Sequence, residues 1–192
     1  MKLLKRCSSI GCLLTVGLFL LICSALGPRA FAVQNAESAG VQDLLYQARE
    51  EAVGLDRDAD QMEALVRSDI DWQTHADYLE SVKTHVNRLA SLIDKLQAER
   101  EDASPWQQQT IVRVVPMLRE IAANTSNAIN HLNENHVRPV SGDYPTWLRA
   151  NAETSHELAE LISDTIHYGQ TRARLEKLAG ELQINPPELK SR

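Results

Sequence analysis

The sequence predicts an all-α protein, folded as an antiparallel up-down-up-down four-helix bundle with coiled-coil-like seams. Between residues 41 and 182, apolar residues recur at alternating spacings of four and three in four long stretches. That spacing is the a/d pattern of helices that pack side by side. Short polar connections separate the stretches, and no alternating apolar pattern indicates a strand. These features favour the bundle. The alternative is a three-helix or splayed arrangement with the first helix detached.

The first two helices are predicted over residues 41–66 and 72–96. The first seam has small residues at several core positions, so we expect neighbouring helices to approach it closely. The segment "SDID", residues 68–71, supplies turn and N-cap residues before the second helix. His75 occupies a core position of the second seam, where a bundle usually buries leucine.

The third helix begins at "SPWQ", where Ser104 is the expected N-cap and Pro105 the first helical residue. Gln107 completes a capping box with Ser104. Its seam runs over residues 111–136. Pro116 lies inside this helix, and its missing N–H and its ring should bend the helix about one turn earlier.

The segment "VRPVSGDYP", residues 137–145, predicts the loop between the third and fourth helices. The fourth helix follows over residues 146–182, and its apolar stripe shifts by one position after Gly169. Such a shift indicates a change of helix phase or of packing partner. Residues 183–192 contain two consecutive prolines and form the expected C-terminal tail.

Residues 1–32 have the order of a secretory signal peptide. Basic residues precede an apolar run over residues 10–26, and Ala30 and Ala32 form a small-x-small cleavage pattern. Residues 33–40 are small and polar and form the expected leader of the mature chain. We therefore predict an exported protein, periplasmic or extracellular. An uncleaved segment would instead tether the chain to a membrane, because the apolar run approaches spanning length.

Composition excludes several classes of protein. All three cysteines lie within the predicted signal peptide, so the mature chain has no disulfide, cysteine-ligated zinc, c-type haem attachment or cysteine nucleophile. The chain has 20 basic and 26 acidic residues, and removal of the signal peptide leaves 16 basic residues and a net charge of about −10. Such a chain repels nucleic acid, so no nucleic-acid partner is expected.

No motif in the chain supports catalysis. The segment "DRDAD" resembles the start of a calcium loop, but Gln61 and Arg67 stand where that loop needs glycine and glutamate. "ETSH", residues 153–156, matches the Glu-x-x-His element of di-iron bundles, which need two copies of it. Glu153 also falls on the outer face of its helix. No Gly-x-Ser-x-Gly or phosphate loop occurs, and we expect no enzymatic activity.

A cofactor site is possible only at one end of the bundle. Antiparallel topology brings the first and third connections to the same end, where Met62, His75 and His136 are all seam residues. Paired histidines, or a methionine and a histidine, can hold a b-type haem in a bundle core. The alternative, which we favour, is a core histidine with a satisfied hydrogen bond and no cofactor. His156 lies at the edge of the fourth seam, slightly deeper from this end. His85, His131 and His167 fall off their seams and are expected at the surface.

The C-terminal part of the fourth helix is the predicted contact surface. This helix is longer than its neighbours, and its shifted stripe carries Leu175, Ala179 and Leu182. A lone helix cannot bury such a stripe, so we predict a self-association or partner interface. The alternative is a helix end that folds back over the connection between the second and third helices.

Three segments, "SPWQQQ", "HLNENH" and "LISDTIHYG", together resemble a family of exported bacterial helical proteins. The resemblance covers about residues 41–182. It implies export and an all-helical domain, and it implies no activity, cofactor or site residue. From the sequence we therefore expect an exported, non-enzymatic bundle that acts through protein–protein contacts. The alternative function is a haem- or metal-binding bundle that uses His75 with His136 or Met62.

Overall fold

The computed structural model describes residues 38–68 and 70–184. The chain divides into two compact units, Met1–Gln34 and Asn35–Arg192, and every described residue belongs to the second. The predicted signal peptide lies outside the described residues, as do most of the predicted leader and tail.

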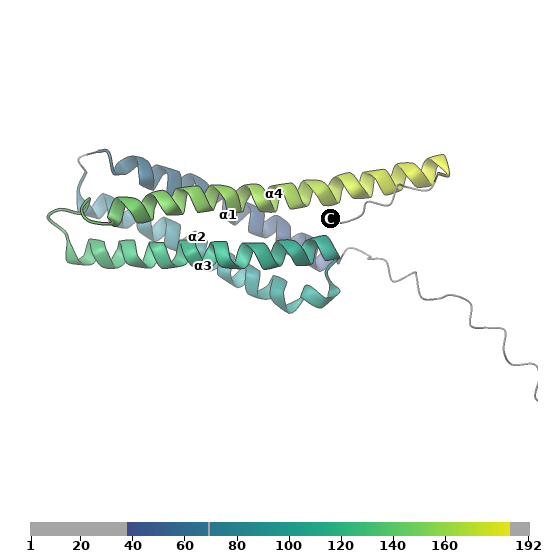
Figure 1. Ribbon diagram of the computed structural model, residues 1–192, viewed down its shortest axis with the longest axis horizontal. Coiled ribbons are helices and arrows are strands. Elements are labelled where there is room, and N and C mark those ends of the chain that lie inside the picture. The colour runs from purple at the N-terminus through teal and green to yellow at the C-terminus, as the bar shows by residue number, and fades with distance from the viewer. Residues whose placement is uncertain (1–37, 69, 185–192) are drawn as a thin grey trace, which may run out of the picture. The chain divides into compact units, whose positions relative to one another are not determined.

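The second unit is a bundle of four α-helices, which confirms the predicted fold class (Figure 1). Each helix packs chiefly on two others, so that α1 contacts α2 and α4, and α3 contacts the same pair. No strand occurs in residues 38–68 or 70–184. The elements are α1 (Ala39–Leu65), α2 (Trp72–Ala98), the short 3₁₀ helix η1 (Arg100–Asp102), α3 (Pro105–Glu134) and α4 (Tyr144–Leu182).

Side-chain caps explain where the first three long helices begin. The Ser38 hydroxyl accepts a hydrogen bond from the backbone N–H of Val41 in α1, and the Asp71 carboxylate accepts one from Thr74 in α2. In α3 the predicted capping box is present, and the Ser104 N–H donates to the Gln107 side chain at 2.9 Å. These contacts satisfy backbone donors that have no partner within the helix.

The end of α3 differs from the prediction. The third seam was expected to continue to His136, but α3 ends at Glu134. The Asn135 side chain turns back and donates a hydrogen bond to the carbonyl oxygen of His131 at 2.9 Å. This bond satisfies one of the carbonyl groups that the helix end leaves free, and the chain leaves the helix before His136.

The core consists of two apolar clusters separated by a polar layer. The smaller cluster lies near the connection between α1 and α2, and the larger occupies the rest of the bundle. Between them lie Thr125 of α3 and Asn151 and Ser155 of α4, all buried. The Asn151 amide donates to the Thr125 hydroxyl at 2.9 Å. The smaller cluster contains Met62, Leu79, Ala128, Leu132, Tyr144 and Leu148.

The predicted seams of α1, α2 and most of α4 coincide with buried residues. In α3 the buried positions differ in part from the predicted seam. Val114, Ile121 and Ala128 are buried, whereas the adjacent Val115 and Ala122, which belong to that seam, are only partly buried. None of the described helices combines the length and apolarity needed to cross a membrane.

Pro116 gives a prediction about stability. It is exposed and lies inside α3, where it removes the hydrogen bond that the Val112 carbonyl oxygen would accept. We expect Pro116→Ala to raise the free energy of unfolding by about 1–3 kcal/mol, since the gain of a helical hydrogen bond outweighs the lost rigidity of the unfolded chain. Urea unfolding of both proteins measures this difference, and an unchanged midpoint would contradict it.

Candidate functional site

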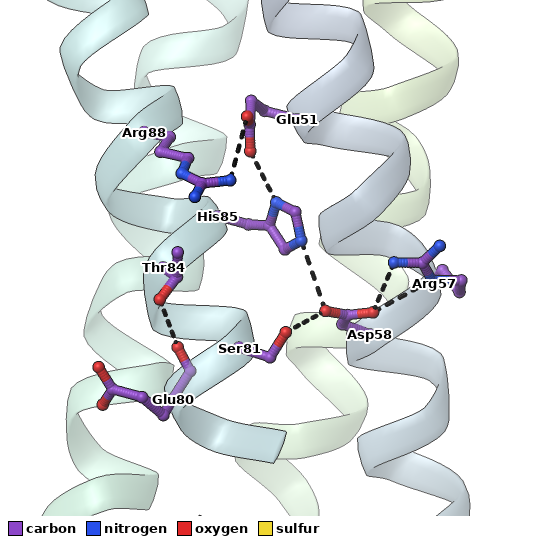
Figure 2. A network of polar contacts seen from close by, with 8 residues as sticks. All are labelled: Glu51, Arg57, Asp58, Glu80, Ser81, Thr84, His85 and Arg88. Atoms are coloured by element: carbon purple, nitrogen blue, oxygen red, sulfur yellow. Dashed lines mark hydrogen bonds and ion pairs between the residues drawn. The ribbon is translucent and has the colours of Figure 1, made fainter. Parts of the chain in front are cut away.

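A network of charged and polar side chains joins α1 to α2 (Figure 2). Glu51 and Asp58 are seven residues apart on α1, and Ser81 and His85 are four apart on α2, so each pair shares one helix face. The imidazole of His85 lies between the two carboxylates. Its Nδ1 is 2.7 Å from Glu51 Oε2, and its Nε2 is 3.4 Å from Asp58 Oδ2.

The same carboxylates have further partners. The Ser81 hydroxyl donates to Asp58, which also forms an ion pair with Arg57 at 3.1 Å. Arg88 lies 3.5 Å from Glu51. Asp58 is buried, whereas the two arginine side chains are more than half exposed, so the arginines contribute little to stability. The network is therefore centred on His85 and Asp58.

Gly54 allows the ring of His85 to reach this position. It lies between Glu51 and Asp58 on α1, and a Cβ atom added there would be only 2.6 Å from His85 Cε1. Any larger residue would push the imidazole away from both carboxylates. The prediction that His85 is a surface residue is wrong for this reason: its side chain is 17% exposed and lies against the α1 backbone.

A second histidine joins α1 to α4. His156 Nδ1 is 3.5 Å from Asp56 Oδ2, and Nε2 is 3.4 Å from Glu160. The hydrogen bond and charge of Asp56 raise the pKa of His156, with smaller contributions from Glu160 and Asp60. His156, predicted at the edge of its seam, is exposed. Two aspartates of the segment "DRDAD" thus contact histidines of the neighbouring helices: Asp58 contacts His85 of α2, and Asp56 contacts His156 of α4.

The predicted cofactor residues are only partly brought together. His75 is fully buried, and its Nδ1 lies 3.2 Å from the hydroxyl of Tyr144, while its Nε2 has no hydrogen-bond partner. Burial lowers the pKa of His75 and raises that of Tyr144. Met62 is buried in the smaller cluster with Tyr144. His136 is exposed and stacks on Trp72, with ring centroids 4.3 Å apart.

His131, predicted to lie at the surface, is partly buried and holds the loop between α3 and α4. Its Nε2 is 3.1 Å from the carbonyl oxygen of Pro139 and 3.3 Å from the hydroxyl of Ser141. The ring also stacks on Tyr144 and meets Trp147 edge-on. The aromatic side chains at this end of the bundle therefore pack on one another.

Two shallow surface hollows occur in the described part of the chain. One covers residues 134–138, and the other lies between α2 and α3 over Val86, Ala122 and Ile129. Neither is lined by His75 or Met62. Within residues 38–68 and 70–184, no group of three or more histidine and acidic side chains is arranged to hold a metal ion.

The predicted contact residues of α4 lie in two environments. Ala179 is buried, whereas Leu175 and Leu182 are exposed. Leu178, which the sequence prediction did not include, is also exposed and lies beside them. The helix continues to Leu182 without folding back.

No family model matches the chain, and no curated protein or solved structure matches it either. The resemblance to exported bacterial helical proteins therefore stays a prediction.

Gly54 can be tested directly. Replacing glycine with alanine inside a helix usually stabilises a protein by roughly 0.5–1 kcal/mol. At Gly54 the added methyl group would collide with a ring that two carboxylates hold, and we expect Gly54→Ala to destabilise the protein by about 1–3 kcal/mol. Gly180→Ala is the matched control, because a Cβ there has no atom within 4 Å. Chemical unfolding measures the free energy of unfolding of both variants. An equal gain in both would show that His85 is free to move.

The pKa of His75 gives a prediction about pH. Because burial lowers this pKa below its ordinary value of about 6.5, the unfolded chain takes up a proton that the folded chain resists. Stability should therefore fall as the pH drops below about 6.5. In His75→Gln, which cannot titrate, the loss of unfolding free energy between pH 7 and pH 5 should be smaller than in wild type. Identical pH profiles would remove His75 as a cause.

Proposed function

We propose that this chain is an exported, non-enzymatic helical bundle that acts through protein–protein contacts made by the C-terminal part of α4. The observation that carries the proposal is the length of this helix. α4 has 39 residues, compared with 27 in α1, 27 in α2 and 30 in α3. Figure 1 shows its C-terminal part, in yellow, continuing beyond the other helices. The predicted signal peptide supports export.

The extension presents an apolar stripe. Leu175, Leu178 and Leu182 are 43%, 42% and 66% exposed, and their spacing of three and four places them on one face of the helix. Elsewhere in the described bundle, leucine is buried or partly buried. Single exposed apolar residues are common on protein surfaces, but a contiguous row of leucines is typical of a helix-pairing face. The stripe therefore supports a helical partner.

Charged residues beside the stripe favour a second copy of the chain as that partner. Arg172 and Arg174 precede the leucines, and Glu181 lies near the end of the stripe. Antiparallel pairing of two extensions about Leu178 would bring the basic end of each helix towards Glu181 of the other. This arrangement is electrostatically complementary, and it matches leucine against leucine. Because the stripe is short, the association should be weak and depend on concentration.

Charge substitutions in the stripe test this function. The protein purified from cells that express the full chain should show a concentration-dependent sedimentation coefficient. Leu175→Glu and Leu182→Glu should abolish that dependence by placing carboxylates in the apolar contact, with little effect on the melting temperature. Val112→Glu is the matched control, because Val112 is 52% exposed on α3, away from the extension.

One sedimentation result would contradict the proposal. A wild type that sediments as a monomer at every concentration, with leucine variants that only lose stability, would make the stripe part of the fold and rule out a second copy as the partner.

A further inference from the structure

The ion pairs between helices converge on α1. Among the described residues, four such pairs join different helices, and every one uses a carboxylate of α1. The remaining ion pairs lie within single helices, except that Arg67, just past the end of α1, pairs with Glu63. Of the four, His85 makes two, His156 makes one, and the exposed Arg88 makes the last. Three of the four therefore exist as ion pairs only when an imidazole is protonated.

The other helices are joined by neutral hydrogen bonds instead. The hydroxyl groups of Thr110 in α3 and Thr165 in α4 are 2.9 Å apart, and Asn151 of α4 donates to Thr125 of α3. Hydroxyl and amide groups of this kind do not change charge between pH 5 and pH 8. Apart from the exposed bond that Gln170 of α4 donates to the Tyr46 hydroxyl, the side-chain contacts from α1 to other helices use its carboxylates, unlike those between α3 and α4.

The ring of His85 has a carboxylate beside each of its nitrogens. Both nitrogens face carboxylate oxygens, which only accept hydrogen bonds, and only the doubly protonated ring donates from both nitrogens. A neutral ring would leave one nitrogen lone pair against Glu51 or Asp58. A neutral ring that keeps its 2.7 Å hydrogen bond to Glu51 therefore turns a lone pair towards Asp58 and loses the ion pair there.

The apolar seam of α1 also buries smaller side chains than that of α2. Its buried core residues include three alanines, whereas those of α2 are leucine, isoleucine and valine apart from His75. Because burial stabilises roughly in proportion to apolar area, α1 gains less from its seam than α2 does. The alanines are Ala48, Ala52 and Ala59.

We propose that α1 is a pH-dependent element of the bundle, fastened to α2 and α4 in mildly acidic solution and loosened as the pH rises above neutrality. The groups that face His85 are Glu51, Asp58 and Arg57 from α1, together with Ser81 and Arg88 from α2. Those that face His156 are Asp56 and Asp60 from α1 and Glu160 from its own helix. With neutral imidazoles, Glu51 and Asp58 of α1 keep only Arg57, Arg88 and Ser81 as partners. Between α1 and α4, Asp56 and Glu160 then lie on either side of an uncharged ring.

The sign of the effect follows from linkage. The pKa of His156 is raised in the folded protein, chiefly by Asp56, so protonation favours the folded contact. Its contribution is complete below pH 6.5, the unfolded value, and is lost as the pH rises through the folded value. This direction is opposite to that of His75, which destabilises the folded protein in acid.

Hydrogen exchange separates the local opening of α1 from the global effect of His75. The protein purified from cells that express the full chain is labelled at pH 6 and pH 8, and peptides of α1 are compared with peptides of α3 after correction for intrinsic exchange. We expect the ratio of α1 to α3 opening to rise by about three- to ten-fold at pH 8, the size expected for the loss of two or three partly exposed ion pairs. Any global effect of His75 acts on both helices and leaves the ratio unchanged.

Three variants make the proposal falsifiable. His156→Lys keeps a positive charge beside Asp56 above pH 8 and should reduce the pH response. His85→Gln should lower the protection of α1 at pH 6 part of the way to the level that wild type shows at pH 8. His167→Gln, at an exposed histidine of α4, should behave as wild type. An α1 to α3 ratio that does not change with pH in wild type, or a full response in His85→Gln, would overturn the proposal.

Discussion

Burial of four apolar seams against one another is the constraint on which the rest of this molecule depends. Apolar seams alone specify register poorly, since neighbouring turns of a helix present similar surfaces. Three buried hydrogen bonds between helices supply what the seams lack. They join His75 to Tyr144, Thr125 to Asn151 and Thr110 to Thr165, and each includes a residue of α4. A polar pair at one level of a bundle favours the register that satisfies it, because any slip would leave both groups buried without partners.

This specificity has a cost in stability. The Nε2 atom of His75, the amide oxygen of Asn151 and the hydroxyl of Ser155 are buried without a hydrogen-bond partner. Each such group costs about 1–3 kcal/mol when it is desolvated. Further buried atoms without a partner lie on α1 (Gln42 Oε1 and Asp56 Oδ1) and on α3 (Trp106 Nε1 and Gln107 Nε2). The bundle combines neutral buried contacts around α4 with charged, partly exposed contacts around α1.

The sequence predicted the fold because the fold depends on patterns within single helices. Spacing of apolar residues placed all four helices, and the capping box at Ser104 placed the start of α3. The site residues depend on relations between helices, and there the prediction failed. His85 lies off its seam, and only the glycine facing it on α1 allows its ring to pack between two carboxylates. A glycine inside a predicted helix, with acidic residues one turn to either side, was the available signal.

The failures at His131 and His136 have a different cause. Both depend on where α3 ends, and Asn135 sets that point by bonding back to the last turn. The end of a helix reflects competition between a side chain and the next backbone hydrogen bond, which differ by little in free energy. Periodicity does not register that competition. It placed His136 on a seam, whereas the chain had already turned to stack its ring on Trp72.

The extension of α4 depends both on contacts within the helix and on its continuity with the packed bundle. α4 has twelve residues more than α1. A segment of that length would not stay helical in isolation, because short helices are marginal in water. The pairs Arg172–Glu176 and Lys177–Glu181, at 3.0 Å and 3.9 Å, add only a few tenths of a kcal/mol each. Continuity with the packed part of α4 removes the cost of nucleation, and the left-handed Gln183, after which Ile184 bonds back to Ala179, closes the end. The leucine stripe is therefore held in helical form before any partner arrives, which lowers the entropy lost on association.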